Sequence, residues 1–454
     1  MKRLRAELIL LLRAKVSCAA LLVLLAAATL AVAAGLAAQH RQVATIARVI
    51  AAHQADLVGV TKTYGKPDSD AGNAAYYTFH LTADPPQPLA FAALGQRDLQ
   101  PFVLRVRLLG LQAQLHETEA YNPELVLPGP FDWSFVLIYL SPLVLIALLH
   151  DLVSSEREAG RLRLLAATPG GVSGVWGRRA SLRGGLVLAA LLLPLWAGAA
   201  VAGASPVGVA MLTLAAALYL TFWLGLSLLV AAIGRRSATN AASLIGLWLV
   251  MTLLGPALGA VIIARNHPVG QGMDLSLAQR EAVHSAWDIP KDAVMTPFKA
   301  KHPEWRDTPP VVGRFHWKWY YAMHEMGDDS VAEAFAAYRA SLKARALWTD
   351  RLGWLLPAAA LQSAAHRLAA TDLEAHLAYQ DRVGAFHRRL QAFYYPYIFS
   401  ERPFTKRDFE RLPKFAAGSE PTELPRQPFA ALGLGALLSL AAAAWALRRT
   451  QLDG

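Results

Sequence analysis

The residues in this sequence best suited to chemistry are a His-Glu pair and a scatter of other histidines. The segment HEMGD, which begins at His324, starts like the zinc-protease motif H-E-x-x-H but has Asp328 where the second histidine is needed. His316 and His324 could share one helix face, although FHWKWYY (315–321) is equally compatible with a strand. We therefore expect no metal site, and we interpret the histidines as exposed or hydrogen-bonded core groups.

Two motifs that mark hydrolytic enzymes are missing. The sequence contains neither a GxSxG nucleophile elbow nor a GxxxxGK[ST] phosphate loop. We therefore expect no catalytic residue and no cofactor in this chain, which is then not an enzyme by itself. If ATP drives its activity, a separate subunit must bind the ATP and its Mg²⁺.

The composition is that of a membrane protein. Only 17% of the 454 residues are charged, against about 25% in soluble proteins. Six apolar runs approach or exceed the roughly 20 residues that a helix needs to cross a bilayer. They predict transmembrane helices at 16–38, 132–149, 185–203, 209–233, 241–264 and 428–447. None has an Asp, Glu, Lys or Arg in its middle, which disfavours a proton- or ion-coupled transporter.

The positive charge gathers in four short segments. Residues 1–15, 150–184, 234–240 and 448–454 hold 15 Lys and Arg against 5 Asp and Glu, whereas the two long stretches hold 29 against 28. Short basic loops lie in the cytoplasm by the positive-inside rule. We therefore predict an α-helical polytopic membrane protein with six transmembrane helices, oriented N-in/C-in. The net charge of +11 then reflects topology rather than a nucleic-acid partner.

The chain ends and the first outer segment have distinct patterns. Residues 1–15 have the spacing of an amphipathic helix at the inner membrane surface, although they could instead begin the first span. In the outer segment 39–131, helical spacing first prolongs the first span, and alternating runs at 76–82 and 102–109 then indicate strands. We expect a small mixed α/β periplasmic domain there, and a cytoplasmic tail at 448–454.

The second outer segment, 265–426, is expected to form a larger, mainly helical periplasmic domain. Helical patterns occupy 276–287, 328–353, 357–369 and 372–395, with Thr371 and Glu374 as a capping box for the last. The apolar run 354–369 is too short for a seventh span, so we expect a buried or membrane-surface helix. The segment also holds two aromatic clusters, interpreted as domain core or, alternatively, as lining of a substrate path or as membrane-interface residues; they are Phe315, Trp317, Trp319, Tyr320, Tyr321, Phe393, Tyr394, Tyr395, Tyr397 and Phe399.

Two stretches of the membrane part are candidate moving elements. Gly255 and Pro256 interrupt the fifth span and are a candidate gate or hinge, with an ordinary kink as the alternative. The second is the charged stretch SSEREAGRLRLLAATP (154–169) after the second span. Ser155 and Glu158 form a capping-box pattern there, and Pro169 precedes two glycines, so we predict a helix of about a dozen residues.

This charged stretch carries a family resemblance. A sequence of the form E-x-E-x-G-T-L after the second of six spans resembles the coupling-helix region of type 2 ABC-transporter permeases, the membrane subunits of ATP-driven exporters. The matching residues run from Glu156, Arg157, Glu158 and Ala159 to Gly160, Arg161 and Leu162, with Arg161 in place of threonine. Residues 95–106 and 361–396 resemble recurrent stretches of a subfamily with a large domain between spans 5 and 6, the domain of unknown function 3526.

The resemblance implies an exporter subunit in a bacterial inner membrane. Its partners would be a dimer of ABC ATPase subunits docked on the 154–169 helix, a second copy or a related permease, membrane lipids and possibly a periplasmic protein. The implied ATPase contacts are Glu156, Arg157, Glu158, Gly160, Arg161 and Leu162. The alternative is a non-transporting receptor or assembly protein, anchored in the membrane and acting through its periplasmic domains.

Overall fold

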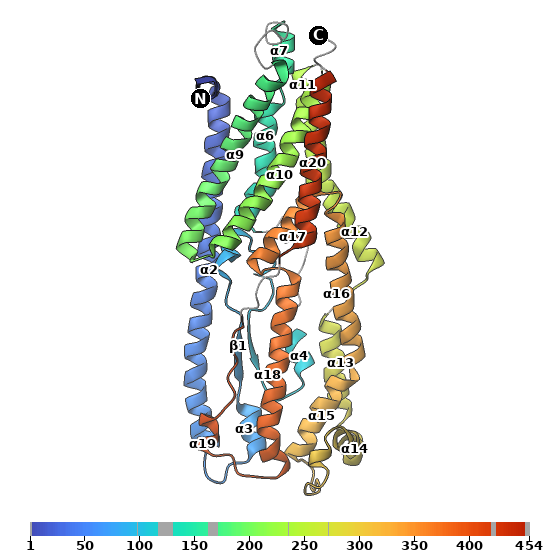
Figure 1. Ribbon diagram of the computed structural model, residues 1–454. Helices are drawn as coiled ribbons and strands as arrows, with labels where there is room; N and C mark the ends of the chain where they lie inside the picture. Colours follow the sequence, from blue (N-terminus) through green and yellow to red (C-terminus); the bar gives the residue numbers. More distant parts are fainter. Residues whose placement is uncertain are drawn as a thin grey trace.

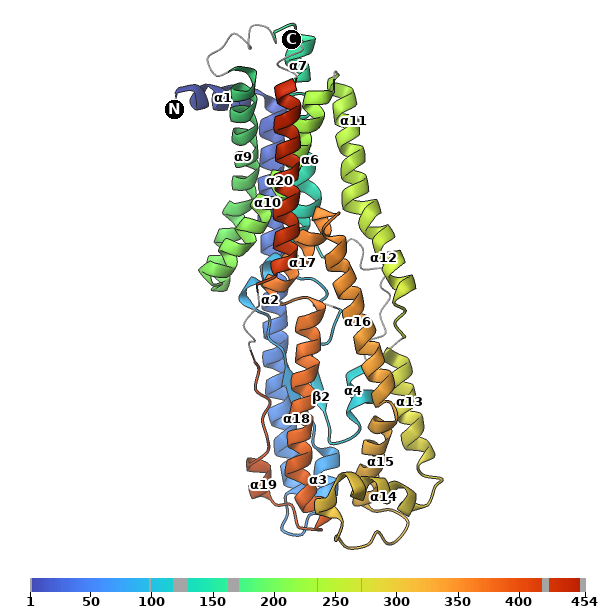
Figure 2. The same ribbon diagram turned by 45° about the vertical axis from the view of Figure 1, so that its right-hand side comes forward.

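The computed structural model describes residues 2–97, 99–116, 130–161, 171–234, 236–270, 272–418 and 424–449. The molecule is elongated, with a helical bundle at the end that carries both termini and a second domain at the other end (Figures 1 and 2). Six helices in the described residues are long and apolar enough to cross a membrane, as the sequence predicts. The protein is therefore a multi-pass membrane protein, and these helices are called spans 1 to 6.

Most of the spans extend further than the apolar runs that predict them. Span 1 is α2 (Lys15–Tyr64); span 2 comprises α5 (Trp133–Phe135), the π-helical η3 (Val136–Leu140) and α6 (Ser141–Leu149); span 3 is α9 (Gly171–Ala202); span 4 is α10 (Pro206–Ile233); span 5 comprises α11 (Ser237–Trp248), the π-helical η4 (Leu249–Leu254) and α12 (Gly255–Asn266); span 6 is α20 (Arg426–Arg449). The long connection predicted at 150–184 is thus mostly helical from Gly171 onward. Its last three charged residues, Arg178, Arg179 and Arg183, lie near the start of span 3.

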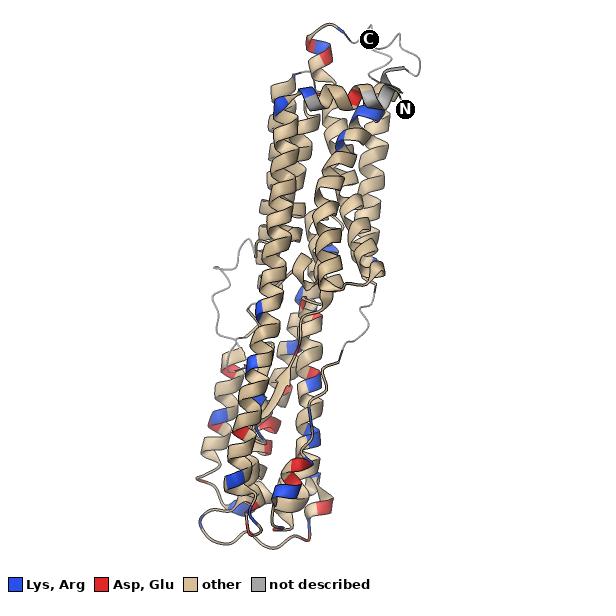
Figure 3. Cartoon of the chain, turned by 90° about the vertical axis from the view of Figure 1, so that its left-hand side faces the viewer, with Lys and Arg blue, Asp and Glu red and all other residues tan. Residues whose placement is uncertain are grey.

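Small residues set the spacing of the bundle. A Cβ atom on Gly225 of α10 would lie 2.7 Å from the backbone carbonyl carbon of Ser439 in α20. Small side chains let membrane helices approach this closely. Figure 3 shows the charged residues at the terminus end and in the second domain, with a mostly uncharged band between them. This band is the part of the molecule that suits a bilayer.

Helices α1 (Lys2–Arg13) and α2 part at Ala14, whose extended backbone (φ −80°, ψ 96°) ends the helical path. Figure 2 shows α1 lying across the end of the bundle rather than along the spans. This favours the surface helix over a helical start of span 1. Helix α2, in contrast, continues through all 50 residues to Tyr64 and extends deep into the second domain (Figure 1).

The two outer segments share a hydrophobic core and so build one domain rather than two, while η1 and α17 pack with the spans. The first contributes α3 (Ala71–Tyr77), β1 (His80–Ala83), η1 (Pro88–Ala92), β2 (Val103–Val106) and α4 (Leu111–His116). The second contributes α13 (Gly272–Ser285), α14 (Lys291–Lys301), η5 (Pro303–Trp305), α15 (Trp317–Ser330), α16 (Ala332–Leu352), α17 (Pro357–Ala369), α18 (Leu373–Phe399) and α19 (Lys406–Glu410). Leu104 and Val106 of β2 share the core with Val383 and Phe386 of α18.

Strands β1 and β2 form an antiparallel pair in which His80 lies opposite Val106. The prediction of a strand from residue 76 is wrong at its start. Tyr76 and Tyr77 belong to α3, because the Asp70 carboxylate accepts hydrogen bonds from the N–H groups of Gly72 and Asn73 and so begins a helix. The sheet is fastened to α18 by the hydroxyls of Thr82 and Tyr379, which are 2.8 Å apart.

Two local predictions for the second segment need correction or completion. Asp372, not Thr371, caps α18, because its carboxylate accepts from the Ala375 N–H, whereas the Thr371 hydroxyl donates to the Ala93 carbonyl over 2.7 Å. In FHWKWYY, the residues after His316 are helical, since α15 begins at Trp317. The aromatic clusters are mainly core; the buried members are Trp319, Tyr321, Tyr394, Tyr395 and Phe399, whereas Phe315 is 43% exposed.

Candidate functional site

The charged segment after span 2 protrudes beyond the bundle at the terminus end, where Figure 1 shows α7 (Ser154–Glu158). The predicted helix of about a dozen residues is wrong, because Gly160 ends it early. Gly160 has a left-handed backbone (φ 68°), its N–H donates to the Arg157 carbonyl, and the Arg161 N–H donates to the Glu156 carbonyl over 2.9 Å. This pair of bonds is the Schellman motif that closes helices at glycine. Leu162 and the predicted stop at Pro169 lie outside the described residues.

The predicted capping box of Ser155 and Glu158 is also absent from this described segment. Val153 before α7 already has helical angles, and the Ser155 N–H donates to the Asp151 carbonyl over 2.9 Å. Helix α7 therefore follows α6 with its first N–H groups already bonded, and there is nothing for a Ser155 cap to satisfy. The Glu158 carboxylate is left for a distant partner.

Glu158 and Arg157 tie α7 to the short connection between spans 4 and 5. The Glu158 carboxylate accepts from the backbone N–H of Ser237 over 2.9 Å, and the Arg157 guanidinium donates to the Gly234 carbonyl over 2.8 Å. Ser237 is the first residue of α11. Glu158, in the short helix that follows span 2, thus caps the first turn of span 5.

Glu156 links α7 to two other helices. Its carboxylate pairs with the Arg161 guanidinium at 2.6 Å and with that of Arg179 in α9 at 3.0 Å, and Arg179 pairs in turn with Glu7 of α1 at 3.0 Å. The four charges alternate in sign along this row. Glu156 and Arg179 have only 13% and 18% of their side chains exposed, so water screens their pairing less than it screens a surface pair.

The structure adds residues that sequence reasoning missed. Glu7, Arg179 and Ser237 complete the network, and the Asn240 amide donates to the His150 carbonyl over 3.2 Å. A polar cavity lies beside it, between α1, α2, α7 and α9, lined by Glu7, Leu10, Leu11, Ala14, Ser17, Glu156, Arg179, Leu182 and Arg183. A search for opposite charges in the short basic segments of the sequence could have found Glu7 and Arg179. No local sequence pattern identifies Ser237.

The predicted contact residues therefore divide into two groups. Glu156 and Arg157 are partly buried and hold the segment in place, whereas Glu158, Ala159, Gly160 and Arg161 are exposed. Arg161 has 58% of its side chain exposed. The surface available to a partner is thus the turn at 158–161.

The candidate gate lies where η4 passes into α12. Pro256 stands in the first turn of α12, directly after the π-helical residues 249–254, so the helix widens where the proline lacks an N–H group. A Cβ atom on Gly255 would lie 3.0 Å from Cδ2 of Leu356, in the chain before α17. Gly255 thus allows a close contact with the second domain, and its role as a gate stays a prediction.

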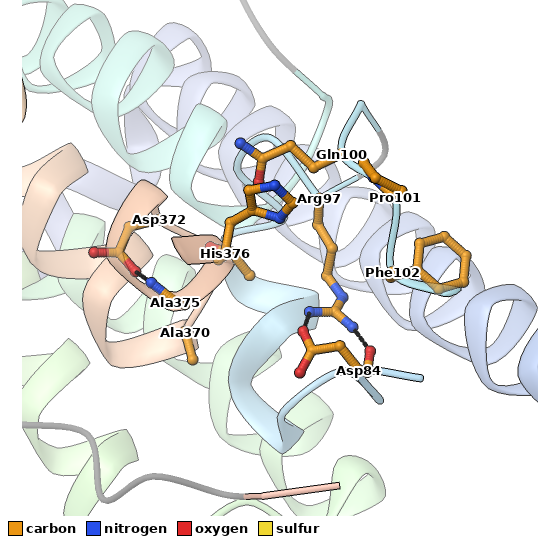
Figure 4. Close-up of a pocket in the computed structure, with 10 residues that line it drawn as sticks. Asp84, Arg97, Gln100, Pro101, Phe102, Ala370, Asp372, Ala375 and His376 are labelled. Carbon is orange, nitrogen blue, oxygen red and sulfur yellow. Dashed lines mark hydrogen bonds and ion pairs between the residues drawn. The ribbon is translucent and has the colours of Figure 1, made fainter. Parts of the chain in front are cut away.

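Residues 95–106 and 361–396 meet at a small polar pocket beside span 1 (Figure 4). Arg97, only 7% exposed, donates to the Gln42 side chain of α2 over 2.8 Å and pairs with Asp84 at 3.0 Å. Asp84 also pairs with Arg382 of α18 at 2.8 Å. The two stretches thus join span 1, the sheet and α18, and the pocket is a structural junction.

The residues of HEMGD have separate structural roles. Burial lowers the pKa of His324 to about 4, so the side chain is neutral. Glu325 accepts a hydrogen bond from Tyr395 over 3.0 Å and pairs with His302. Burial alone would raise the pKa of Glu325, but His302 and Lys301 outweigh it and hold that pKa below its ordinary value. Asp328 accepts from the Leu111 N–H at the start of α4 over 2.6 Å, yet burial raises its pKa to about 7.

Comparison with known proteins identifies one part of the chain. Residues 274–417 match the family model described as "Domain of unknown function (DUF3526)". No curated protein and no solved structure matches the chain. The protein is therefore a six-span helical membrane protein that carries a DUF3526 domain between spans 5 and 6, from α13 to the residues after α19.

Proposed function

We propose that this chain is the permease subunit of an ABC-type exporter in a bacterial inner membrane, driven by ATP that separate subunits bind and hydrolyse. The observation that carries the proposal is the placement of residues 156–161. They protrude at the terminus end of the bundle and are bonded to the start of span 5 and to Arg179 of α9, which in turn pairs with Glu7 of α1. A segment with these connections can pass a displacement to several spans at once.

The route of that displacement follows from the bonds. A partner that presses on the exposed turn at 158–161 moves Glu158, and Glu158 holds the first turn of α11 through Ser237. The Glu156–Arg179 pair carries the same displacement to span 3. Packed helices respond to such a displacement as rigid units. The charge pattern supports a cytoplasmic position for this end, with the DUF3526 domain on the opposite side.

The partners follow from the same arrangement. ATP and Mg²⁺ belong to an ATPase dimer, because the sequence has no phosphate loop. The permease pairs with a second copy or a related permease, and the domain distant from the ATPase can receive or release the exported molecule.

A site-specific cross-link tests this function. A photo-reactive amino acid replaces exposed Arg161, and in a matched control it replaces exposed Arg314 at the opposite end of the molecule. In membranes of the native host, we expect the probe at Arg161, but not at Arg314, to capture a protein that contains a phosphate loop. Purification of the intact complex without any ATPase, together with no such capture, would favour a receptor or assembly protein instead.

A charge reversal provides the functional readout. Arg161→Glu is expected to lower the ATPase activity of the purified complex several-fold, while Arg314→Glu leaves it unchanged. Reversal of both Glu156 and Glu158 to lysine is expected to uncouple transport with membrane insertion retained. Both carboxylates hold α7 against neighbouring helices, so their reversal is expected to release α7 from the spans.

A further inference from the structure

The corner between α16 and α17 reaches back into the level of the spans. Helix α16 runs alongside α12 toward the bundle, and α17 then packs against α10 and α20 (Figures 1 and 2). A Cβ atom on Gly259 of α12 would overlap the Leu352 side chain, and one on Gly255 would lie 3.0 Å from Leu356. Gly255 stands ten residues before Arg265, the first charged residue at that end of span 5. Ten residues of helix rise about 15 Å.

Span 6 places the corner at the same depth. Pro357 approaches within 4.0 Å of a Cβ atom built on Gly435, which stands nine residues after Arg426. Nine residues of helix rise about 13 Å. Two spans on different sides of the corner therefore agree that residues 352–357 lie well inside the apolar band.

The side chains of the corner suit hydrocarbon. Leu355 is 74% exposed and Trp354 is 45% exposed. Residues 352–361 (LGWLLPAAAL) carry no charge. At the base of the corner, Asp350 pairs with Arg367 of α17, and the guanidinium of the exposed Arg351 lies 4.7 Å from the centroid of the Trp348 ring. The apolar exposure continues onto the neighbouring α12, where Leu258 is 63% exposed. A surface of this kind and extent is unfavourable in water.

The backbone of the corner also suits hydrocarbon. An unbonded N–H group in the bilayer core costs several kcal/mol, so irregular backbone there must satisfy its own groups. The N–H of Gly353 donates to the Thr349 carbonyl, that of Trp354 to Arg351, and those of Leu355 and Leu356 to Leu352. Residue 357 is proline and has no N–H group.

We propose that residues 352–357 form a re-entrant corner that inserts into the bilayer, with Trp354 and Leu355 among the acyl chains of the leaflet on the DUF3526 side. The domain is then embedded in the membrane as well as connected to it. The corner also supports span 5, whose apolar window is only 11% buried in the protein, against 61% for span 2 and 56% for span 4.

Depth measurement by spin labelling tests the insertion. In a variant with Cys18 replaced by alanine, a nitroxide is attached to Leu355→Cys in liposomes that contain only this chain. The controls are Leu258→Cys on α12, exposed on span 5, and Val312→Cys, 69% exposed in the loop between η5 and α15. We expect the Leu355 label to collide with O₂ several-fold more than with a water-soluble nickel chelate, as the Leu258 label does, and the Val312 label to show the reverse.

Two results would overturn the proposal. A Leu355 label that resembles the Val312 label would place the corner in water. A label with little access to either reagent would show that protein, such as a second copy of the chain, covers the corner. If Leu355→Cys fails to fold, Trp354→Cys gives the same comparison. Because the liposomes lack any ATPase, the outcome is independent of the exporter proposal.

Discussion

The carboxylate of Glu158 lies 2.9 Å from the backbone nitrogen of Ser237, although 79 residues separate the two in the chain. The first N–H groups of a helix have no partner within it. Glu158, from the short helix after span 2, supplies one of these partners for span 5. An exposed turn at the terminus end is in this way bonded to span 5, whose apolar window is only 11% buried.

Replacement of Glu158 by alanine is expected to loosen the start of span 5. Loss of a capping acceptor costs about 0.5–2 kcal/mol. Hydrogen exchange followed by mass spectrometry should show faster exchange in peptides that cover the first turns of α11. Ser155→Ala is the matched control, because its hydroxyl caps no helix; equal effects of the two variants would contradict the cap.

Replacement of Gly160 by alanine is expected to destabilise the turn that ends α7. Gly160 has φ 68°, and a left-handed backbone costs roughly 1–2 kcal/mol for a residue with a Cβ atom. We expect faster exchange across 154–161 and a weaker Glu156–Arg161 pair. Gly177→Ala in α9 has open space around the new methyl group and should be neutral or slightly stabilising. A neutral Gly160→Ala would show that the turn adopts another backbone.

Replacement of Gly35 by alanine is expected to disrupt the packing of span 1. A Cβ atom there would overlap the backbone carbonyl of Phe91 in η1, and backbone cannot move aside as a side-chain end can. Overpacking of this kind costs about 1–3 kcal/mol or more, to be measured by chemical unfolding in detergent micelles.

The control for Gly35 lies on the same helix. Gly59 has no atom within 4 Å of a new Cβ, so Gly59→Ala should be neutral or stabilising. If both glycine variants of α2 unfold like the parent protein, the close approach of span 1 to η1 is absent in solution.

Replacement of Asp328 by asparagine is expected to change how stability depends on pH. Burial raises the pKa of Asp328 from 3.8 to about 7. Between these values the unfolded chain releases the proton and the folded chain keeps it. The carboxyl group therefore lowers the free energy of unfolding as pH rises from about 4 to 7, by up to about 1.4 kcal/mol per pH unit.

The pH measurement compares the parent protein with Asp328→Asn. Asparagine keeps an acceptor for the N–H groups at the start of α4 but does not titrate. The stability of the parent relative to the variant should decrease across this pH window in micelles. A constant difference would indicate that Asp328 is ionised in the folded protein throughout the window.

Local patterns were enough to locate the spans and the long extension of span 1. A span needs only a continuous apolar run, and the helical spacing of Val43, Ile46 and Ile50 continues the same helix outward. The position of the charged segment at the terminus end of the bundle follows from that order of spans. None of these properties depends on which distant residue becomes a neighbour.

The tertiary structure decided the rest, because it depends on contacts between residues far apart in the chain. Glu158 fits a local capping box equally well, and only folding brings it to Ser237 instead. The two outer segments share a core because β2 packs on α18, which no spacing within either segment reveals. The run at 354–369 was ambiguous between a buried and a membrane-surface helix, and only the fold brings Leu356 to Gly255 in span 5 and packs α17 on α10 and α20.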